Sequence, residues 1–242
     1  MLGNKSPSIS FQEENRQIER KHSGMKRLNF LRADLFSSKK CYFLVKRLFD
    51  ILFGLIGILV LVPVSLLVKL AYLLSGDTAT IFFRQARVGL NGKMITIVKF
   101  RSMVPGAEEV LRELLKDERY RSEWEANQKF NDDPRLTKVG KALRKLSVDE
   151  LPQLLNVLAG DMSLVGPRPL VEGELEFHKG RKLYQTVKPG ITGWWCCNGR
   201  SNIHYTQRLE LEYYYIKNCS LYLDALCIFR TVLAVLRRDG AQ

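Results

Sequence analysis

The feature that most restricts how this chain can fold is an uncharged apolar segment at residues 51–68. Its length is close to the ~20 residues that a helix needs to cross the hydrocarbon core of a bilayer. Pro63 lies inside this segment, and Gly54 and Gly57 are expected to loosen its first half. A proline does not exclude a simple spanning helix, but it weakens the backbone hydrogen bonding and marks a place where the helix can break. The segment therefore predicts a helix in contact with a membrane.

The charges beside the apolar segment indicate how this helix meets the membrane. Short basic flanks stay on the cytoplasmic side of a membrane. A helix that breaks at Pro63, enters one leaflet and returns keeps both flanks on that side. We therefore expect a re-entrant helix over residues 44–75 rather than a spanning helix, and a buried helix of a soluble core is the third alternative. The basic residues are Lys39, Lys40, Lys46 and Arg47 before the segment, and Lys69, Arg84, Arg87 and Lys93 after it.

The composition points to an acidic partner. The formal net charge is +13 and the isoelectric point is about 9.6, which suits nucleic acid, anionic lipid or a phosphorylated substrate. The sequence has no nucleic-acid-binding motif, P-loop or dinucleotide fingerprint. Three scattered histidines fit no metal-ligand spacing, and five cysteines without CxxC pairs indicate a reduced cytosolic setting. A membrane-tethered basic scaffold is the alternative from a different functional class.

The order of local patterns predicts an α+β fold that is mainly helical. We expect a basic mobile arm at residues 1–43, the membrane helix at 44–75, a catalytic cytoplasmic domain at 76–203 and amphipathic helices at 204–242. Residues 81–83 and 94–98 are strand-like and flank the turn at 89–92, which predicts a small β-hairpin. The last helix has an apolar side that either lies on an anionic membrane or packs on the core. That side is formed by Leu226, Phe229, Leu233 and Leu236.

Residues 144–169, with the sequence RKLSVDELPQLLNVLAGDMSLVGPRP, hold the strongest candidate site. Ser147 and Glu150 have the spacing of a capping box, which would place Asp149 and Glu150 in the first turn of a helix that ends at Gly160. Such carboxylates often only complement the helix dipole. The alternative is that free N–H groups, Arg144, Lys145 and Arg168 lower the pKa of Asp149 and attract phosphate, so that the ionised carboxylate attacks phosphorus.

Other basic residues are candidates for phosphate binding. Lys99 and Arg101 have the same parity, so they would line one face of the second strand, although a solvated face is equally consistent with the pattern. The stiff turn at residues 166–169 would aim Arg168, and the glycine-rich loop at 190–200 would offer Arg200. An ordinary surface turn is the alternative at both places, and Asp133 and Arg135 lie in a further turn.

Four motifs follow the basic-flanked apolar segment: KFRSM at residues 99–103, DPRLT at 133–137, LSVDELPQLLNVLAGDMSLVGPRP at 146–169, and KPGITGW with NGR at 188–200. Together they resemble the bacterial sugar transferase family, whose members are monotopic polyprenyl-phosphate phosphoglycosyl transferases. The resemblance covers about residues 44–238. It is to the minimal form of the family, in which no multi-span membrane domain precedes the catalytic part.

This resemblance implies transfer of a sugar-1-phosphate from a UDP-sugar to undecaprenyl (polyprenyl) phosphate, with release of UMP. The reaction would open polysaccharide or glycoconjugate biosynthesis, as for exopolysaccharide or lipopolysaccharide, at the cytoplasmic face of the bacterial inner membrane. Asp149 would be the nucleophile that forms a covalent phosphosugar intermediate. Glu150 would assist the acceptor or shape a Mg²⁺ site, so both carboxylates are the expected Mg²⁺ ligands. The substrate-binding candidates are Arg144, Arg168, Arg200, Lys99, Arg101, Asp133 and Arg135.

The implied partners are the UDP-sugar, polyprenyl phosphate and an anionic membrane, without nucleic acid, and a homo-oligomer is left open. The nearest rival activity is a glycosyl transferase on the same lipid, which would release UDP. Three positions depart from the family pattern. Val62 replaces a frequent serine before Pro63, Glu212 replaces a common aspartate, and residues 195–197 read WCC instead of the usual AQV, which bears on nucleotide or sugar recognition.

Overall fold

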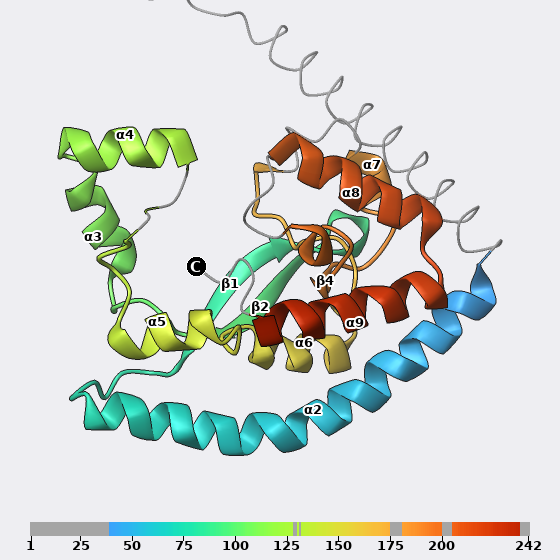
Figure 1. Ribbon diagram of the computed structural model, residues 1–242, viewed down its shortest axis with the longest axis horizontal. Coiled ribbons are helices and arrows are strands. Elements are labelled where there is room, and N and C mark those ends of the chain that lie inside the picture. Colours follow the sequence, from blue (N-terminus) through green and yellow to red (C-terminus); the bar gives the residue numbers. More distant parts are fainter. Residues whose placement is uncertain (1–38, 128–129, 131, 175–180, 200–204, 238–242) are drawn as a thin grey trace, which may run out of the picture.

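The computed structural model describes residues 39–127, 130, 132–174, 181–199 and 205–237. Residues 1–38 of the expected basic arm, and Arg200, lie outside the described residues. The described part is a mainly helical α+β structure, as predicted, and it contains two small sheets (Figure 1). Helix α2 (Lys40–Leu74) runs along one side of all the other elements.

Helix α2 is continuous through Pro63, where we expected a break, and it bends along its length (Figure 1). A proline removes only its own N–H donor and displaces one carbonyl, so a helix can bend there without ending. Ser65 Oγ donates to the Leu61 carbonyl at 2.7 Å within this bend. With 35 residues at ~1.5 Å per residue, α2 is longer than the ~30 Å hydrocarbon core. It is the one described helix long and apolar enough to cross a membrane.

The glycines of α2 allow close packing against helix α6 (Leu154–Ala159). A Cβ atom on Gly54 would lie 2.7 Å from the Leu158 side chain, and one on Gly57 would lie 2.4 Å from the Leu154 side chain. A larger residue at either position would force the leucine side chain to move, so the glycines allow this close contact. The stretch that we expected to be loosened is thus tightly packed.

Polar side chains join both ends of α2 to the rest of the protein. Near its start, Arg47 donates to the last carbonyls of α6 at 2.6 and 2.8 Å. One turn later the buried Asp50 accepts hydrogen bonds from strand β3 (Ser163–Val165) at 2.9 and 3.0 Å. Near its end, Lys69 donates to the carbonyls of Thr78 and Ala79 at 3.1 and 3.3 Å.

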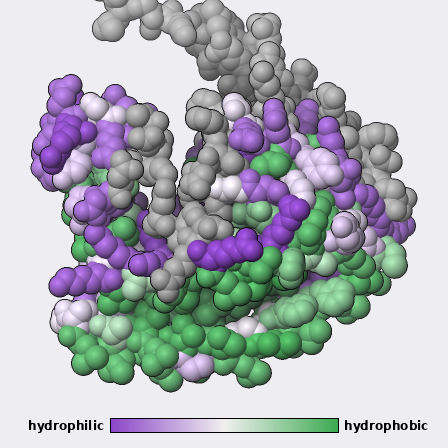
Figure 2. Space-filling view, in the orientation of Figure 1, coloured by the Kyte–Doolittle hydropathy of each residue, from purple (hydrophilic) through white to green (hydrophobic). Residues whose placement is uncertain are grey.

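The outward face of α2 is apolar along nearly its whole length. Figure 2 shows a broad hydrophobic band over this helix, whereas hydrophilic residues gather over α3 (Ala107–Leu114) and α4 (Glu118–Asn127). A soluble monomer rarely exposes so large an apolar surface. The exposed side chains include Leu48, Leu52, Leu55, Leu59, Val62, Leu66, Leu70 and Leu74.

The predicted hairpin is present and is longer than the sequence pattern indicated. Strand β1 (Phe82–Val88) pairs with β2 (Met94–Phe100), from Phe82 opposite Phe100 to Val88 opposite Met94. The second sheet was not predicted. It is a parallel pair of β3 with β4 (Gly190–Thr192), which places the GPRP turn beside the glycine-rich loop. A Cβ atom on Gly190 would lie 2.1 Å from the Gly166 nitrogen, so only glycine fits there.

Helices α7 (Arg181–Tyr184), α8 (Tyr205–Asn218) and α9 (Leu221–Arg237) enclose the second sheet. Helix α9 buries Leu223 and Cys227 in this core, yet Phe229 and Leu236 are exposed. Packing on the core is therefore present on one side of α9, while contact of its outward side with a membrane stays a prediction. Helix α5 (Lys138–Lys145) lies between the first hairpin and the far end of α2.

Candidate active site

Asp149 and Glu150 lie in a turn after α5, not in the first turn of an α-helix, so the capping-box prediction is wrong. Ser147 adopts a left-handed conformation with φ of 56°. Its N–H donates to the Arg144 carbonyl at 2.9 Å, and the N–H of Val148 donates to the Leu143 carbonyl at 3.0 Å. This Schellman pattern ends the preceding helix. Ser147 is therefore used as a helix stop and not as a helix start.

The chain then forms a short 3₁₀ turn at Leu151–Gln153 before α6, which ends at Gly160 as predicted. The carbonyl of Asp149 accepts a hydrogen bond from the Phe100 N–H at 2.8 Å. Lys99, the preceding residue of β2, forms an ion pair with Glu150 at 2.7 Å. The end of β2 thus positions the carboxylate pair, and the predicted association of Lys99 with this site is present in the structure.

The pKa of Asp149 is raised, whereas we expected it to be lowered. Burial is the main cause and the neighbouring charge of Glu150 adds to it, while Lys99 and Arg144 act in the opposite direction. The 3₁₀ turn begins only after Glu150, and a backbone hydrogen bond is the smallest of the effects on the pKa of Asp149. Positive charge brought close to the pair would favour its ionised form.

A small cavity lies between Glu150 and the second sheet, and Asp149 is the neighbour of a lining residue rather than part of the lining. On one side it is lined by Lys99, Glu150 and Gln153, and on the other by Arg87, Arg168 and Trp195. Three cationic side chains thus surround one opening, which is an arrangement that suits a phosphorylated ligand.

Arg87 is a cavity residue that the sequence reasoning missed. It donates to the Gln85 side chain at 2.5 and 3.2 Å and to the Pro169 carbonyl at 3.2 Å. Burial lowers the pKa of Arg87, and the nearby charge of Arg168 lowers it further. A bound anion would relieve this repulsion between two guanidinium groups. The pairing of the two strands could have identified Arg87. Residues directly opposite one another lie on the same face of a sheet, and Arg87 lies opposite Ile95, on the face that also carries Lys99.

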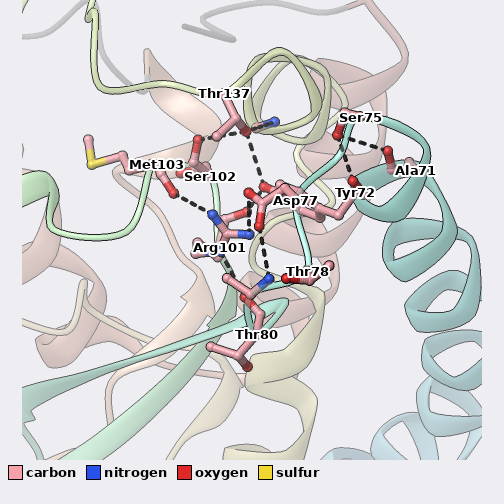
Figure 3. Close-up of polar contacts among 12 residues, drawn as sticks. Ala71, Tyr72, Ser75, Asp77, Thr78, Thr80, Arg101, Ser102, Met103 and Thr137 are labelled. Carbon is pink, nitrogen blue, oxygen red and sulfur yellow. Dashed lines mark hydrogen bonds and ion pairs between the residues drawn. The ribbon is translucent and has the colours of Figure 1, made fainter.

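Arg101 is not brought to the cavity. Its guanidinium donates to the carbonyls of Thr80 and Met103 and to Asp77 Oδ2, at 2.7, 3.1 and 2.8 Å, as Figure 3 shows. It also lies 4.4 Å from the centre of the Tyr72 ring at the end of α2. These contacts use all three guanidinium nitrogens in structural links. The alternation of side chains between the two faces of β2 does not apply to Arg101, since the strand ends at Phe100.

Asp133 and Arg135 also lie apart from the cavity lining. They form a buried ion pair at 2.6 Å, and Arg135 lies over the rings of Trp124 and Phe130. This pair anchors α4. Arg144 donates to Ser102 Oγ at 3.1 Å, and its charge acts on both Asp149 and Asp133. Of the predicted arginines in the described residues, Arg168 lines the cavity and Arg144 lies close enough to act on the carboxylate pair.

The carboxylates of Asp149 and Glu150 suit Mg²⁺ only together with ligands from substrate phosphate and water. Within the described ranges, no group of three or more His, Cys, Asp or Glu side chains is arranged to hold a metal ion. Magnesium commonly uses one or two protein carboxylates together with substrate phosphates and water. Asp149 and Glu150 supply that minimal donor set beside a cavity suited to phosphate.

Most of the chain is similar to known proteins. A family model described as bacterial sugar transferase matches residues 41–238. The chain is 45% identical over 199 residues to the undecaprenyl-phosphate galactose phosphotransferase of Salmonella typhimurium, covering 81% of this chain but 41% of that protein. It is 41% identical over 198 residues to the exopolysaccharide production protein ExoY of Sinorhizobium fredii, covering 81% of this chain and 87% of that protein.

A third relative, from Aeromonas hydrophila, is a UDP-N-acetylgalactosamine-undecaprenyl-phosphate N-acetylgalactosaminephosphotransferase. It is 34% identical over 240 residues, covering 94% of this chain and 52% of that protein. The chain therefore spans about half or less of the Salmonella and Aeromonas proteins. The family match covers most of the chain and includes every described residue of the cavity. This protein belongs to the bacterial sugar transferase family.

Proposed function

We propose that this protein transfers a sugar-1-phosphate from a UDP-sugar to undecaprenyl phosphate. The observation that carries the proposal is the Asp149–Glu150 pair beside a cavity lined by Lys99, Arg87 and Arg168. Two anionic substrates need neutralisation of charge more than proton transfer. The names of the relatives support the choice of donor and acceptor.

The proposed reaction has two displacements at the same phosphorus atom. In the first, an Asp149 carboxylate oxygen attacks the sugar-proximal phosphorus, the bond to the bridging oxygen breaks, and UMP leaves. In the second, an oxygen of undecaprenyl phosphate attacks the aspartyl phosphosugar and releases Asp149. Division into two steps lets a soluble donor and a membrane-bound acceptor use one cavity in turn.

The side chains around the cavity have separate tasks in this scheme. Lys99 holds Glu150 at 2.7 Å and limits its repulsion of Asp149. Arg87 and Arg168 neutralise the diphosphate, and Arg144 adds positive charge next to the nucleophile. Asp149 and Glu150 would hold Mg²⁺, which when bound offsets the phosphate charge.

For the membrane arrangement, we propose that α2 enters only the cytoplasmic leaflet of the bacterial inner membrane. Both ends of the helix bond to the same folded body, through Arg47 and Asp50 at one end and, at the other, through Tyr72, whose hydroxyl donates to the Arg101 carbonyl. A spanning helix would carry its two ends to opposite sides of the membrane. The apolar outward face of α2 supports insertion of that face into lipid (Figure 2).

The released nucleotide tests the activity. The full chain in lipid nanodiscs is supplied with undecaprenyl phosphate, Mg²⁺ and a panel of UDP-sugars, and the nucleotide products are separated. We expect UMP with at least one donor and none from Asp149→Asn, while Asp132→Asn, a change at an exposed surface carboxylate, keeps activity. Release of UDP would instead establish a glycosyl transferase. Unchanged activity of Asp149→Asn would favour a role that does not use the carboxylate pair.

A further inference from the structure

Glu212 is a buried carboxylate that the proposed reaction does not use. It lies on α8 with 1% of its surface exposed, and neither carboxylate oxygen meets full hydrogen-bond geometry with a described residue, although the main-chain N–H of Arg168 is near enough to lower its pKa. Arg208 Nε is 4.0 Å from Oε1, beyond hydrogen-bonding distance. Buried polar groups normally have partners, since an unpaired carboxylate loses its hydration without compensation.

The complementary donor belongs to Arg168. Its Nε is also buried and has no hydrogen-bond partner within the described part of the chain. Both the main-chain N–H and the charge of Arg168 lower the pKa of Glu212, so this carboxylate lies next to Arg168. Arg208 differs, because its Nη2 already contacts Glu174 at 3.1 Å. The structure thus holds a buried acceptor and a buried donor that are close but not joined.

Both arginines connect Glu212 to the cavity. The guanidinium groups of Arg168 and Arg208 lie 5.7 and 5.9 Å from the centre of the Trp195 ring, and Trp195 and Arg168 line the cavity. Glu212 therefore lies next to Arg168, the arginine that lines the cavity. A guanidinium held through Nε can present its other nitrogens together to a phosphate group.

We propose that Glu212 is a positioning residue for Arg168. When a diphosphate occupies the cavity, Arg168 Nε–H donates to the Glu212 carboxylate, and the terminal nitrogens of Arg168 bind the diphosphate oxygens. The identity of the diphosphate as that of a UDP-sugar rests on the proposed function. The link between Glu212 and anion binding does not.

The ionisation of Glu212 gives this role a pH signature. Burial raises the pKa of Glu212 to about 7, against the lowering effect of Arg208 and Arg168, while Glu174 raises it further. Tyr184 is the other titratable group whose charge is coupled to Glu212. A charge-assisted bond to Arg168 favours the ionised carboxylate, so anion binding lowers its pKa. Anion affinity is therefore full above about pH 7 and falls as the pH drops below it.

A double-mutant cycle tests the proposal with inorganic pyrophosphate as the probe. Its affinity for the full chain in nanodiscs is measured by calorimetry for the wild type, Glu212→Gln, Arg168→Lys and the double variant. We expect Glu212→Gln to weaken binding by about ten- to a hundredfold, and to weaken it little further once Arg168 is changed. Glu210→Gln, at an exposed carboxylate on the same helix, should bind like the wild type. The proposal would be overturned if Glu212→Gln lost no pyrophosphate affinity, or if it lost the same amount whether or not Arg168 had been changed.

Two further readouts separate positioning from folding. Glu212→Gln removes a buried charge that meets Arg208 only at 4.0 Å, so its melting temperature should stay close to that of the wild type. The part of the pyrophosphate affinity that falls below about pH 7 because Glu212 becomes protonated should be missing in Glu212→Gln and present in Glu212→Asp. Loss of that part in Glu212→Asp, or its persistence in Glu212→Gln, would contradict the proposal. A coupled cycle without UMP formation would contradict the proposed function alone.

Discussion

Two basic residues near the end of β2 have different surroundings and different expected roles. Lys99 reaches Glu150 beside the cavity, and about a quarter of its side chain is exposed. Arg101 is buried and bonds to Asp77 and two backbone carbonyls. The alternation of side chains along a strand had predicted that both residues lie on the same face and share a role in phosphate binding. The sequence pattern cannot show where a strand stops, and the alternation of side chains ends with the strand.

Substitution of each residue should separate catalysis from stability. We expect Lys99→Met to lower turnover by about ten- to a hundredfold with little change in unfolding free energy, because a partly exposed ion pair contributes little to folding. Arg101→Met should cost about 2–4 kcal/mol of stability, since it leaves buried acceptors unpaired. Thermal unfolding and initial rates measure both. Equal stability losses in the two variants would contradict the assignment.

The Asp77–Arg101 pair should also make stability depend on pH. The hydrogen bond from Arg101 is the main cause that lowers the pKa of Asp77 in the folded state. A lowered carboxyl pKa adds stability above the unfolded value of about 4 and loses it as the pH falls through the folded value. The melting temperature of Asp77→Asn should therefore lie below that of the wild type at pH 7. The gap should close under acidic conditions, and a constant gap at every pH would count against this pair.

Among the elements, those with strong local patterns were predicted and those made by distant contacts were not. The hairpin of β1 and β2 follows from two strand-like runs around a glycine turn. The pairing of β3 with β4 joins three-residue strands that lie far apart in the sequence. The segment at Ser147 has the pattern of a helix start, but the same residue closes α5. Local rules could not choose between these uses, because the preceding helix decides the backbone conformation.

The contact between α2 and α6 gives a prediction about helix packing. Gly57→Leu would force a side chain into Leu154, and overpacking of this kind typically costs about 1–3 kcal/mol. Because α6 continues directly from the turn that holds Asp149 and Glu150, turnover should fall as well. Val60→Leu enlarges an exposed residue of the same helix and should change neither. Unfolding and activity of the two variants should be compared; equal behaviour would exclude close packing at Gly57.

At the scale of the whole molecule, α2 connects the candidate site to the membrane. The sequence predicted a membrane helix from charge and hydropathy alone. It could not show that both helix ends bond to one folded body, since those bonds come from α6, β3 and the residue after β2. We propose that this arrangement brings the cavity close to the lipid surface, where the proposed acceptor, a polyprenyl phosphate, would present its headgroup.

Labelling from each side of the membrane tests this arrangement. Cys41, exposed at the start of α2, and a cysteine from Arg84→Cys on β1 mark the two flanks of the helix. In cells that make the protein, a membrane-impermeant maleimide should label neither flank until the inner membrane is opened. A Cys41→Ser background isolates the second flank. Labelling of the Arg84→Cys variant from the periplasmic side of an intact membrane would establish a spanning helix.

The most direct measurement is the intact mass of the protein after incubation with a UDP-sugar and Mg²⁺ but no acceptor. We predict a mass increase of one phosphosugar, one equivalent of UMP, and loss of the adduct when undecaprenyl phosphate is added. Asp149→Asn should form no adduct, and Asp132→Asn should form it normally. An active protein that releases UMP only when both substrates are present, and never carries the phosphosugar on Asp149, would contradict the two-step reaction.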